Sequence, residues 1–172
     1  MIEGVVIKEL QTFSDERGFF RELVRFDDCR FFINQASYGM RATGTATGWH
    51  IHQHLKEVFC VTRGIARIVL KDCRVGKPVK TNFVYREPQK VFMVEYGLSS
   101  TPDEYMEVVL GGHMPKSVVI PFGVAHGYKV LQGECDMLYF ASNTYDVSRD
   151  DEGRIGPDRW PEHNWMREIE VK

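Results

Sequence analysis

The residues with the clearest chemical potential lie between positions 50 and 57, where the sequence reads HIHQHLKE. Residues two apart on a β-strand point to the same face, so His50 and His52 would project together while Ile51 faces the other way. Glu57 follows a predicted turn and would return a carboxylate to the same place. Imidazole and carboxylate groups gathered at one point can bind a transition metal or move protons.

A second stretch, PFGVAHGY at 121–128, adds a third histidine. Pro121 and Gly123 predict a turn that leads His126 into the next strand. Three imidazoles and one carboxylate suit Zn, Fe, Mn, Ni or Co, with positions left open for a substrate. The alternative is that the same side chains bind a substrate without any metal. The candidate metal ligands are His50, His52, Glu57 and His126.

Composition limits the class of protein. The 172 residues suit a single domain, 1–172, with a core large enough to fold unaided. A net charge of −2 argues against a nucleic-acid or acidic-membrane surface. There is no 18-residue apolar run, and Glu3, Lys8 and Glu9 interrupt the start where a signal peptide would need an apolar stretch. We therefore expect a cytoplasmic protein without a membrane span.

Short segments rich in β-branched and aromatic residues predict an all-β sandwich or barrel. In VTRGIARIV, Gly64 predicts a tight hairpin between two strands. A short helical turn is expected within 25–32 and another within 158–172, and the polar, proline-containing stretch 74–90 predicts a surface excursion. The expected strands lie within 4–10, 18–24, 57–63, 65–70, 90–97, 105–112, 116–121, 125–131 and 135–142.

The spacing around the histidines resembles a known pair of motifs. From Gly44 to Gly64 the chain reads G-x5-H-x-H-x4-E-x6-G, and P-x-G-x-x-H follows at 121–126. This pair resembles the two motifs of the cupin superfamily, although the second lacks its leading glycine and trailing asparagine. The resemblance implies a double-stranded β-helix, or jelly roll.

A longer resemblance covers about residues 2–158. DERGFFRE near the N-terminus resembles the signature of the dTDP-4-dehydrorhamnose 3,5-epimerases, which are cupin-fold enzymes. The likeness continues in order through TGWHIHQ (47–53), VTRGIARIVLKDCR (61–74), VVIPFGVAHGYKVL (118–131) and MLYFASNTYDV (137–147).

This resemblance implies epimerisation or isomerisation of a 4-keto-6-deoxy nucleotide sugar, linked to dTDP or another nucleotide, in polysaccharide biosynthesis. The family removes the proton alpha to the 4-keto group and needs no cofactor. By resemblance, His50 is the base and Tyr139 the acid. The family also forms homodimers that exchange N-terminal strands, which would bring Arg17 to the diphosphate from the other subunit. The implied substrate-binding residues are Arg17, Phe20, Glu22, Gln35, His126 and Tyr145.

The sequence departs from this family in ways that keep alternatives open. Thr47 replaces an arginine, Glu57 replaces a lysine that supplies positive charge near the sugar's 4-oxygen, and the late aspartate that pairs with the base histidine is expected to be missing. A metal at the four candidate ligands would replace the lysine as Lewis acid, but His50 would then not be the free base. Without a metal, activity is expected to be restricted to one carbon or changed to ketoisomerisation. The alternatives are a metal-dependent dioxygenase or small-substrate isomerase, and a non-catalytic module that binds nucleotide sugars.

Overall fold

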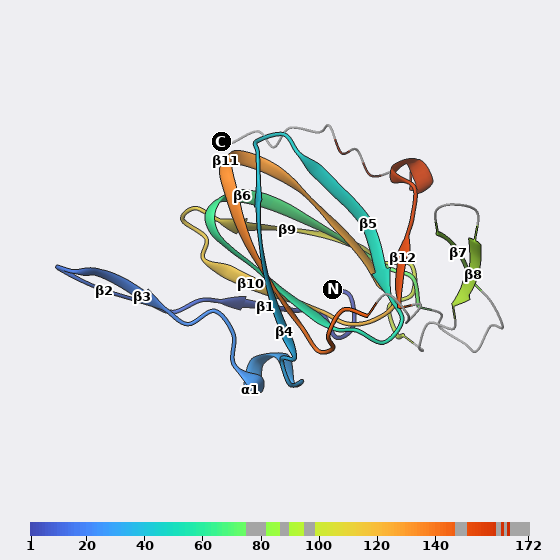
Figure 1. Cartoon of the computed structure of the whole chain (residues 1–172), viewed down its shortest axis with the longest axis horizontal. Helices are drawn as coiled ribbons and strands as arrows, with labels where there is room; N and C mark the ends of the chain where they lie inside the picture. Colours follow the sequence, from blue (N-terminus) through green and yellow to red (C-terminus); the bar gives the residue numbers. More distant parts are fainter. Residues whose placement is uncertain are drawn as a thin grey trace.

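The computed structural model describes residues 1–74, 82–86, 90–94, 99–146, 151–160, 163 and 165, with only the backbone given for 82–86 and 90–94. Strands dominate, as predicted, and curve around a common centre, while one hairpin projects away from them (Figure 1). The elements are β1 (Val6–Glu9), β2 (Thr12–Asp15), β3 (Gly18–Arg21), α1 (Phe26–Cys29), β4 (Gln35–Arg41), β5 (Ala46–His52), β6 (Glu57–Asp72), β7 (Asn82–Arg86), β8 (Lys90–Val94), β9 (Tyr105–Gly111), β10 (Lys116–Ile120), β11 (Val124–Ala141), β12 (Glu152–Arg154) and a 3-10 turn at Pro157–Arg159.

Eight of these strands form one antiparallel sheet in the order β1-β10-β6-β11-β5-β12, with β4 also paired to β11 and β9 also paired to β6. The two long strands each serve several neighbours. The start of β6 pairs with β10 and its second half pairs with β9, while β11 pairs first with β5 and then with β4. This exchange of partners wraps the sheet around itself, because each long strand takes part in both walls.

The prediction of a hairpin at Gly64 is wrong. The chain does not reverse there, because β6 runs without a break from Glu57 to Asp72. The glycine marks a bend instead: its φ is +77°, and a Cβ on it would lie 2.6 Å from the carbonyl oxygen of Glu134. The facing strand β11 shifts register between Val130 and Met137, so both strands bend together. The expected strands 57–63 and 65–70 are therefore one strand, β6, and the expected strands 125–131 and 135–142 are likewise one strand, β11.

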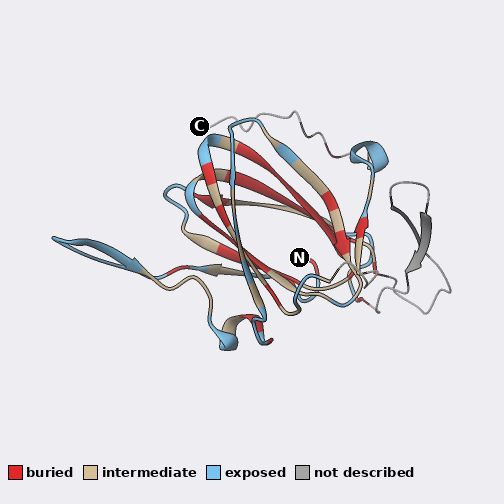
Figure 2. Ribbon diagram, viewed as in Figure 1, coloured by how far each residue is buried: buried red, intermediate tan, exposed pale blue. Residues whose placement is uncertain are grey.

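Side-chain alternation along β5 separates the core from the pocket. Buried stretches of chain lie in the strands of the barrel, whereas the β2–β3 hairpin is mostly exposed (Figure 2). Trp49 and Ile51 are each 1% exposed and pack in a cluster on one side of β5. His50 and His52 point to the opposite side, as their spacing predicted. The largest apolar cluster lies on that side and includes Phe59, so the pocket is built directly against the core.

The back of β5 and β11 is closed by aromatic residues from the end of the chain. Trp165 lies edge-on to Trp49 with ring centroids 5.2 Å apart. It fits against two glycines, since a Cβ on Gly127 would lie 2.6 Å from the Trp165 ring and one on Gly48 would lie 3.2 Å from it. These two glycines stand beside the pocket histidines, so the tryptophan holds the backbone that carries them.

The structure also bears on the predicted helical turns and on the predicted surface segment 74–90. The helical turn predicted within 25–32 is confirmed as α1, and the 3-10 turn begins at the edge of the predicted 158–172 region. Within 74–90, β7 pairs with β8 as a separate hairpin, while 75–81 and 87–89 lie outside the described residues. In the part of the chain that the structure describes, no helix is long and apolar enough to cross a membrane.

Candidate active site

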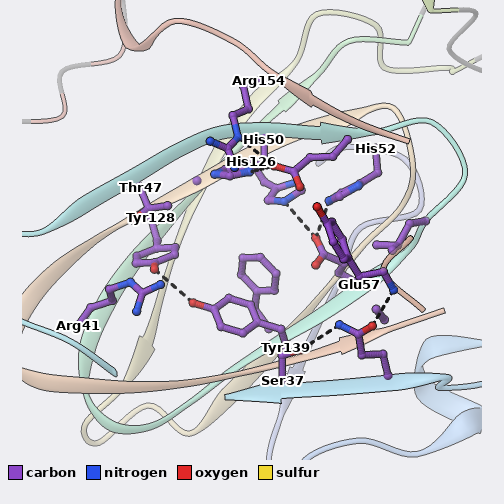
Figure 3. Close-up of a pocket in the computed structure, with 17 residues that line it drawn as sticks. Ser37, Arg41, Thr47, His50, His52, Glu57, His126, Tyr128, Tyr139 and Arg154 are labelled. Carbon is purple, nitrogen blue, oxygen red and sulfur yellow. Dashed lines mark hydrogen bonds and ion pairs between the residues drawn. The ribbon is translucent and has the colours of Figure 1, made fainter. Parts of the chain in front are cut away.

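A pocket of about 290 Å³ opens between the two walls of the sheet, lined by side chains from β4, β5, β6, β11 and β12 (Figure 3). It brings together most of the residues singled out in the sequence. Arg17, Phe20 and Glu22 are not among them: Arg17 and Phe20 lie in a separate hollow along the projecting β2–β3 hairpin. The predicted residues that line the pocket are Gln35, His50, His52, Glu57, His126, Tyr139 and Tyr145.

His50 pairs with a carboxylate that sequence reasoning missed. Its Nδ1 lies 2.8 Å from Glu152 Oε1, and Arg154 Nε donates to the same oxygen at 3.2 Å. The hydrogen bond with His50 outweighs burial and lowers the pKa of Glu152 to about 2. An ionised partner at Nδ1 keeps the proton on that nitrogen and leaves Nε2 free to act as a base.

The structure thus gives His50 a carboxylate partner from a part of the chain where the sequence analysis named no site residue. Glu152 reaches the pocket because the short strand β12 pairs with β5, placing Glu152 opposite His52 and Arg154 opposite His50. The acidic run around 150–152, close after the predicted pocket residue Tyr145, was the available signal. Its pairing with a strand a hundred residues earlier was not visible locally.

A second cluster joins His52, Glu57 and His126. The Nε2 atoms of the two histidines lie 3.5 Å and 3.1 Å from Glu57 Oε2, respectively. Their Nδ1 atoms are already engaged, with Asp151 at 2.9 Å and with the carbonyl oxygen of Val124 at 3.1 Å. Both rings are therefore fixed with Nε2 directed at one carboxylate.

The charges in this cluster are strongly coupled. Burial lowers the pKa of His52, but its bonds to Asp151 and Glu57 outweigh this and raise it to about 10. Burial raises the pKa of Glu57, and its contacts with His126 and His52 more than offset this, so that it falls well below its usual range. The cluster therefore holds a carboxylate and an imidazolium side by side at neutral pH.

This second cluster fits a metal ion by geometry. The three candidate ligand atoms lie within 4.8 Å of one another, and Glu57 Oε2 is buried without a well-aligned hydrogen bond. Histidines that bind metals usually donate their other N–H to a carboxylate or carbonyl, as His52 and His126 do here. His50, the fourth predicted ligand, lies outside this group and faces Glu152 instead.

Tyr139 lies on the other side of the pocket from His50 (Figure 3). Its hydroxyl donates to Tyr128 Oη at 3.2 Å, and the ring of Phe59 stands edge-on to it with centroids 4.9 Å apart. Burial, aided by the bond to Tyr128, raises the pKa of Tyr139 well above its usual range. The phenol therefore stays protonated at neutral pH and is able to donate.

Two predicted substrate residues stand together near the pocket mouth. Gln35 Oε1 accepts a hydrogen bond from the backbone N–H of Tyr145 at 2.7 Å, and the Gln35 amide donates to Ser37 Oγ at 3.1 Å. Tyr145 is 71% exposed. Its ring is thus available to a ligand that enters from solvent, while Gln35 fixes the backbone behind it.

The chain resembles known proteins over almost its full length. The profile of the polysaccharide biosynthesis C-terminal domain matches residues 13–97. The spore coat polysaccharide biosynthesis protein SpsL of Bacillus subtilis is 33% identical over 173 residues, which cover 98% of this chain and 99% of SpsL. The dTDP-4-dehydrorhamnose 3,5-epimerase of Shigella flexneri is 29% identical, over 95% of this chain and 85% of that enzyme.

Among solved structures, that of NovW, a 4-keto-6-deoxy sugar epimerase from Streptomyces spheroides, superposes with a TM-score of 0.71 at 22% identity, covering 91% of this chain and 71% of NovW. The likeness confirms the predicted cupin jelly roll. The protein is thus a cupin-fold protein of the sugar-epimerase type. It belongs to the dTDP-4-dehydrorhamnose 3,5-epimerase-like family, as a divergent member.

The pairing of Glu152 with His50 predicts a pH-dependent contribution to stability. Because folding lowers the pKa of Glu152 from 4.5 to about 2, the contribution is fully present above pH 4.5 and is lost as the pH falls toward 2. Glu152→Gln should therefore lower the free energy of unfolding by about 1–2 kcal/mol at pH 7, after discounting for partial exposure, and by roughly half of that or less at pH 3.

Urea unfolding of both proteins at the two pH values measures this difference. Glu134→Gln is the matched control, because Glu134 pairs with Arg63 on the surface, where both side chains are more than half exposed. A loss of stability in Glu152→Gln that is the same at pH 3 and pH 7 would contradict the assignment of an ionised Glu152 bonded to His50.

Proposed function

We propose that this protein is an epimerase that acts on a 4-keto-6-deoxy nucleotide sugar, with His50 as the base and Tyr139 as the acid. The observation that carries the proposal is a histidine held by Glu152 on one side of a pocket, with the partly buried phenol of Tyr139 on the other side. The names of the relatives support the same reaction, since the Shigella flexneri protein is a dTDP-4-dehydrorhamnose 3,5-epimerase and NovW acts as a 4-keto-6-deoxy sugar epimerase.

The proposed reaction proceeds in two proton transfers. His50 Nε2 removes the proton from the carbon next to the ketone, and the electron pair of that C–H bond becomes the enolate. Glu152 stabilises the imidazolium that forms, as a buried carboxylate does beside a catalytic histidine. Tyr139 then donates its phenolic proton to the same carbon from the opposite face, and the enolate returns to the ketone. Exchange with water restores the proton of Tyr139 and removes the one on His50.

The enolate needs a positive charge, and Glu57 stands where the resembling family has a lysine. The Nε2 of His126 and Oε2 of Glu57 are 3.1 Å apart, and two bare lone pairs at that distance would repel. A proton or a metal ion must lie between them. In the proposal a proton does so, and the substrate then faces Glu57 paired with the His52 imidazolium rather than a bare carboxylate.

We further propose that two copies of the chain complete the nucleotide site. The β2–β3 hairpin projects from the barrel with Phe13, Phe19 and Phe20 at least half exposed (Figure 1). Among the described residues, the side chain of Arg17, at the hairpin tip, bonds to Asp15 alone, and Arg17 is not one of the described residues that line the pocket. A second copy that exchanges this hairpin would bury the three rings and bring Arg17, Phe20 and Glu22 to a nucleotide.

The reaction is tested by deuterium exchange. In D₂O, the wild-type protein should introduce deuterium beside the ketone of dTDP-4-keto-6-deoxyglucose, followed by NMR. His50→Asn should slow this exchange by about 10²–10⁴-fold, because the base is lost. Tyr139→Phe should still exchange but invert the carbon much more slowly, since His50 can return a deuteron only to the face from which it took the proton.

His54→Asn is the control for these variants, because His54 is exposed and lies outside the pocket. Wild-type protein that binds the nucleotide sugar yet exchanges no deuterium would overturn the epimerase assignment in favour of a binding module.

Exchange of the hairpin predicts that activity can be restored by mixing two inactive variants. Arg17→Ala and His50→Asn destroy contributions from different chains to one site, so a mixed dimer should regain one intact site. Up to about a quarter of the wild-type rate is expected after the two variants are unfolded and refolded together, from the statistics of random pairing. Light scattering should give twice the 19.9 kDa chain mass. A mixture that stays inactive while the protein is dimeric would rule out a shared site.

A metal-dependent cupin enzyme is the second candidate, favoured by the three ligand atoms within 4.8 Å at His52, Glu57 and His126. A divalent ion held there would supply Lewis-acid stabilisation of an oxyanion. This candidate predicts one ion per chain in protein purified without chelator or affinity tag, measured by elemental analysis, and loss of the ion in Glu57→Ala. Glu134→Ala should keep it. Protein with far less than one ion per chain rejects the metal and leaves the proton between His126 and Glu57.

A further inference from the structure

Arg41, the last residue of β4, lines the pocket but plays no part in either of its two clusters. Its Nη1 donates to the carbonyl oxygen of Met40 at 2.9 Å, so the side chain folds back along its own strand. A Cβ built on Gly39 would lie 3.5 Å from Arg41 Nη1 and 3.7 Å from Tyr139 Oη. The guanidinium and the phenol of Tyr139 therefore share the space above this glycine.

The charges of the pocket single out Arg41. Each carboxylate that lines it is already matched by cationic or hydrogen-bonding partners: Glu57 contacts His52 and His126, and Glu152 contacts His50 and Arg154. Arg41 makes no ion pair with any acid among the described residues. It therefore leaves an uncompensated positive charge where the pocket meets solvent, and its fork of N–H donors suits the oxygens of a phosphate.

Arg41 also lies close to the position of an arginine that the resembling family has and this chain lacks. The resembling family has an arginine where this chain has Thr47. Thr47 lines the same pocket and lies opposite Tyr128 in the β5–β11 pairing, and Tyr128 in turn bonds to Tyr139. Arg41 lies at this same end of the pocket, beside the two tyrosines and away from Glu57 (Figure 3). A guanidinium has thus been lost from one strand and is present on another.

We propose that Arg41 binds the diphosphate of the nucleotide sugar and takes over the role of the arginine that Thr47 replaces. This rests on the proposed function for the identity of the ligand. Binding there orients the substrate, with the phosphates at the Arg41 end and the sugar between His50 and Tyr139. Arg41 is a binding and specificity residue in this arrangement, and the proton transfers stay with His50 and Tyr139.

Calorimetry with three probes isolates the phosphate contact. Arg41→Ala should weaken binding of dTDP by about ten- to a hundredfold, as expected for loss of a charge-assisted bidentate contact. The affinity for thymidine should not change, because thymidine has no phosphate. Arg41→Lys should recover only part of the loss, because a lysine offers a point charge rather than a fork. In the Arg41→Ala background, Thr47→Arg should restore dTDP affinity.

Arg63→Ala is the matched control, since Arg63 is an exposed strand arginine that pairs with Glu134 and Asp136 outside the pocket. Unchanged dTDP affinity in Arg41→Ala overturns the proposal, as does an equal loss for dTDP and thymidine. A fall in kcat with unaltered dTDP affinity also overturns it and assigns Arg41 to Tyr139 instead. Inorganic pyrophosphate separates a failure of the anion site from a failure of the proposed function. If the wild-type protein binds pyrophosphate through Arg41 but does not bind dTDP, the nucleotide-sugar substrate is wrong and the phosphate site at Arg41 remains.

Discussion

The pairing of β12 with β5 is the constraint on which the pocket depends. These three residues of β12 add one short strand to the edge of the sheet, and with it they place Glu152 against His50 and Arg154 beside both. A histidine ring on an exposed strand edge would turn freely, whereas here its Nδ1 is held by the carboxylate of Glu152. The direction in which Nε2 points, and so the face of a substrate it can reach, follows from a backbone pairing between segments a hundred residues apart.

The same pairing separates two roles that the sequence left in competition. His50 could not be both a metal ligand and a free base, and the motif alone offered no way to choose. In the folded chain the alternation along β5 sends both histidines to the same side, yet each meets a different acid: Glu152 for His50, Asp151 and Glu57 for His52. One strand thus holds a histidine paired with Glu152 at one point of the pocket and a histidine within a charged cluster at another, which is the division of roles that the proposed function uses.

Features that depend on local geometry were predicted from the sequence, whereas those that depend on contacts between distant segments were not. The shared face of His50 and His52 and the short helical turn at α1 depend on local geometry, and both were predicted. The ordered series of motifs led to the jelly roll and to the family, which the relatives confirm. Gly64 was read correctly as unusual backbone but wrongly as a reversal, because a bulge and a hairpin place similar demands on a glycine. Glu152 was missed because only tertiary pairing brings it to the pocket, and the assignment of roles to the pocket residues, like that of a single domain, stays a prediction.

The closure of β5 and β11 from behind by Trp165 has a consequence for how the protein is made. The strands that carry His50 and His126 are synthesised before the residues that fix them, since Glu152 and Trp165 come later in the chain. A nascent chain that has exposed β1 to β11 has the histidines of the site, but neither the carboxylate of the base nor the aromatic support behind Gly48 and Gly127. The pocket in this fold is therefore complete only after the segment that carries Glu152 and Trp165 has docked on β5 and β11.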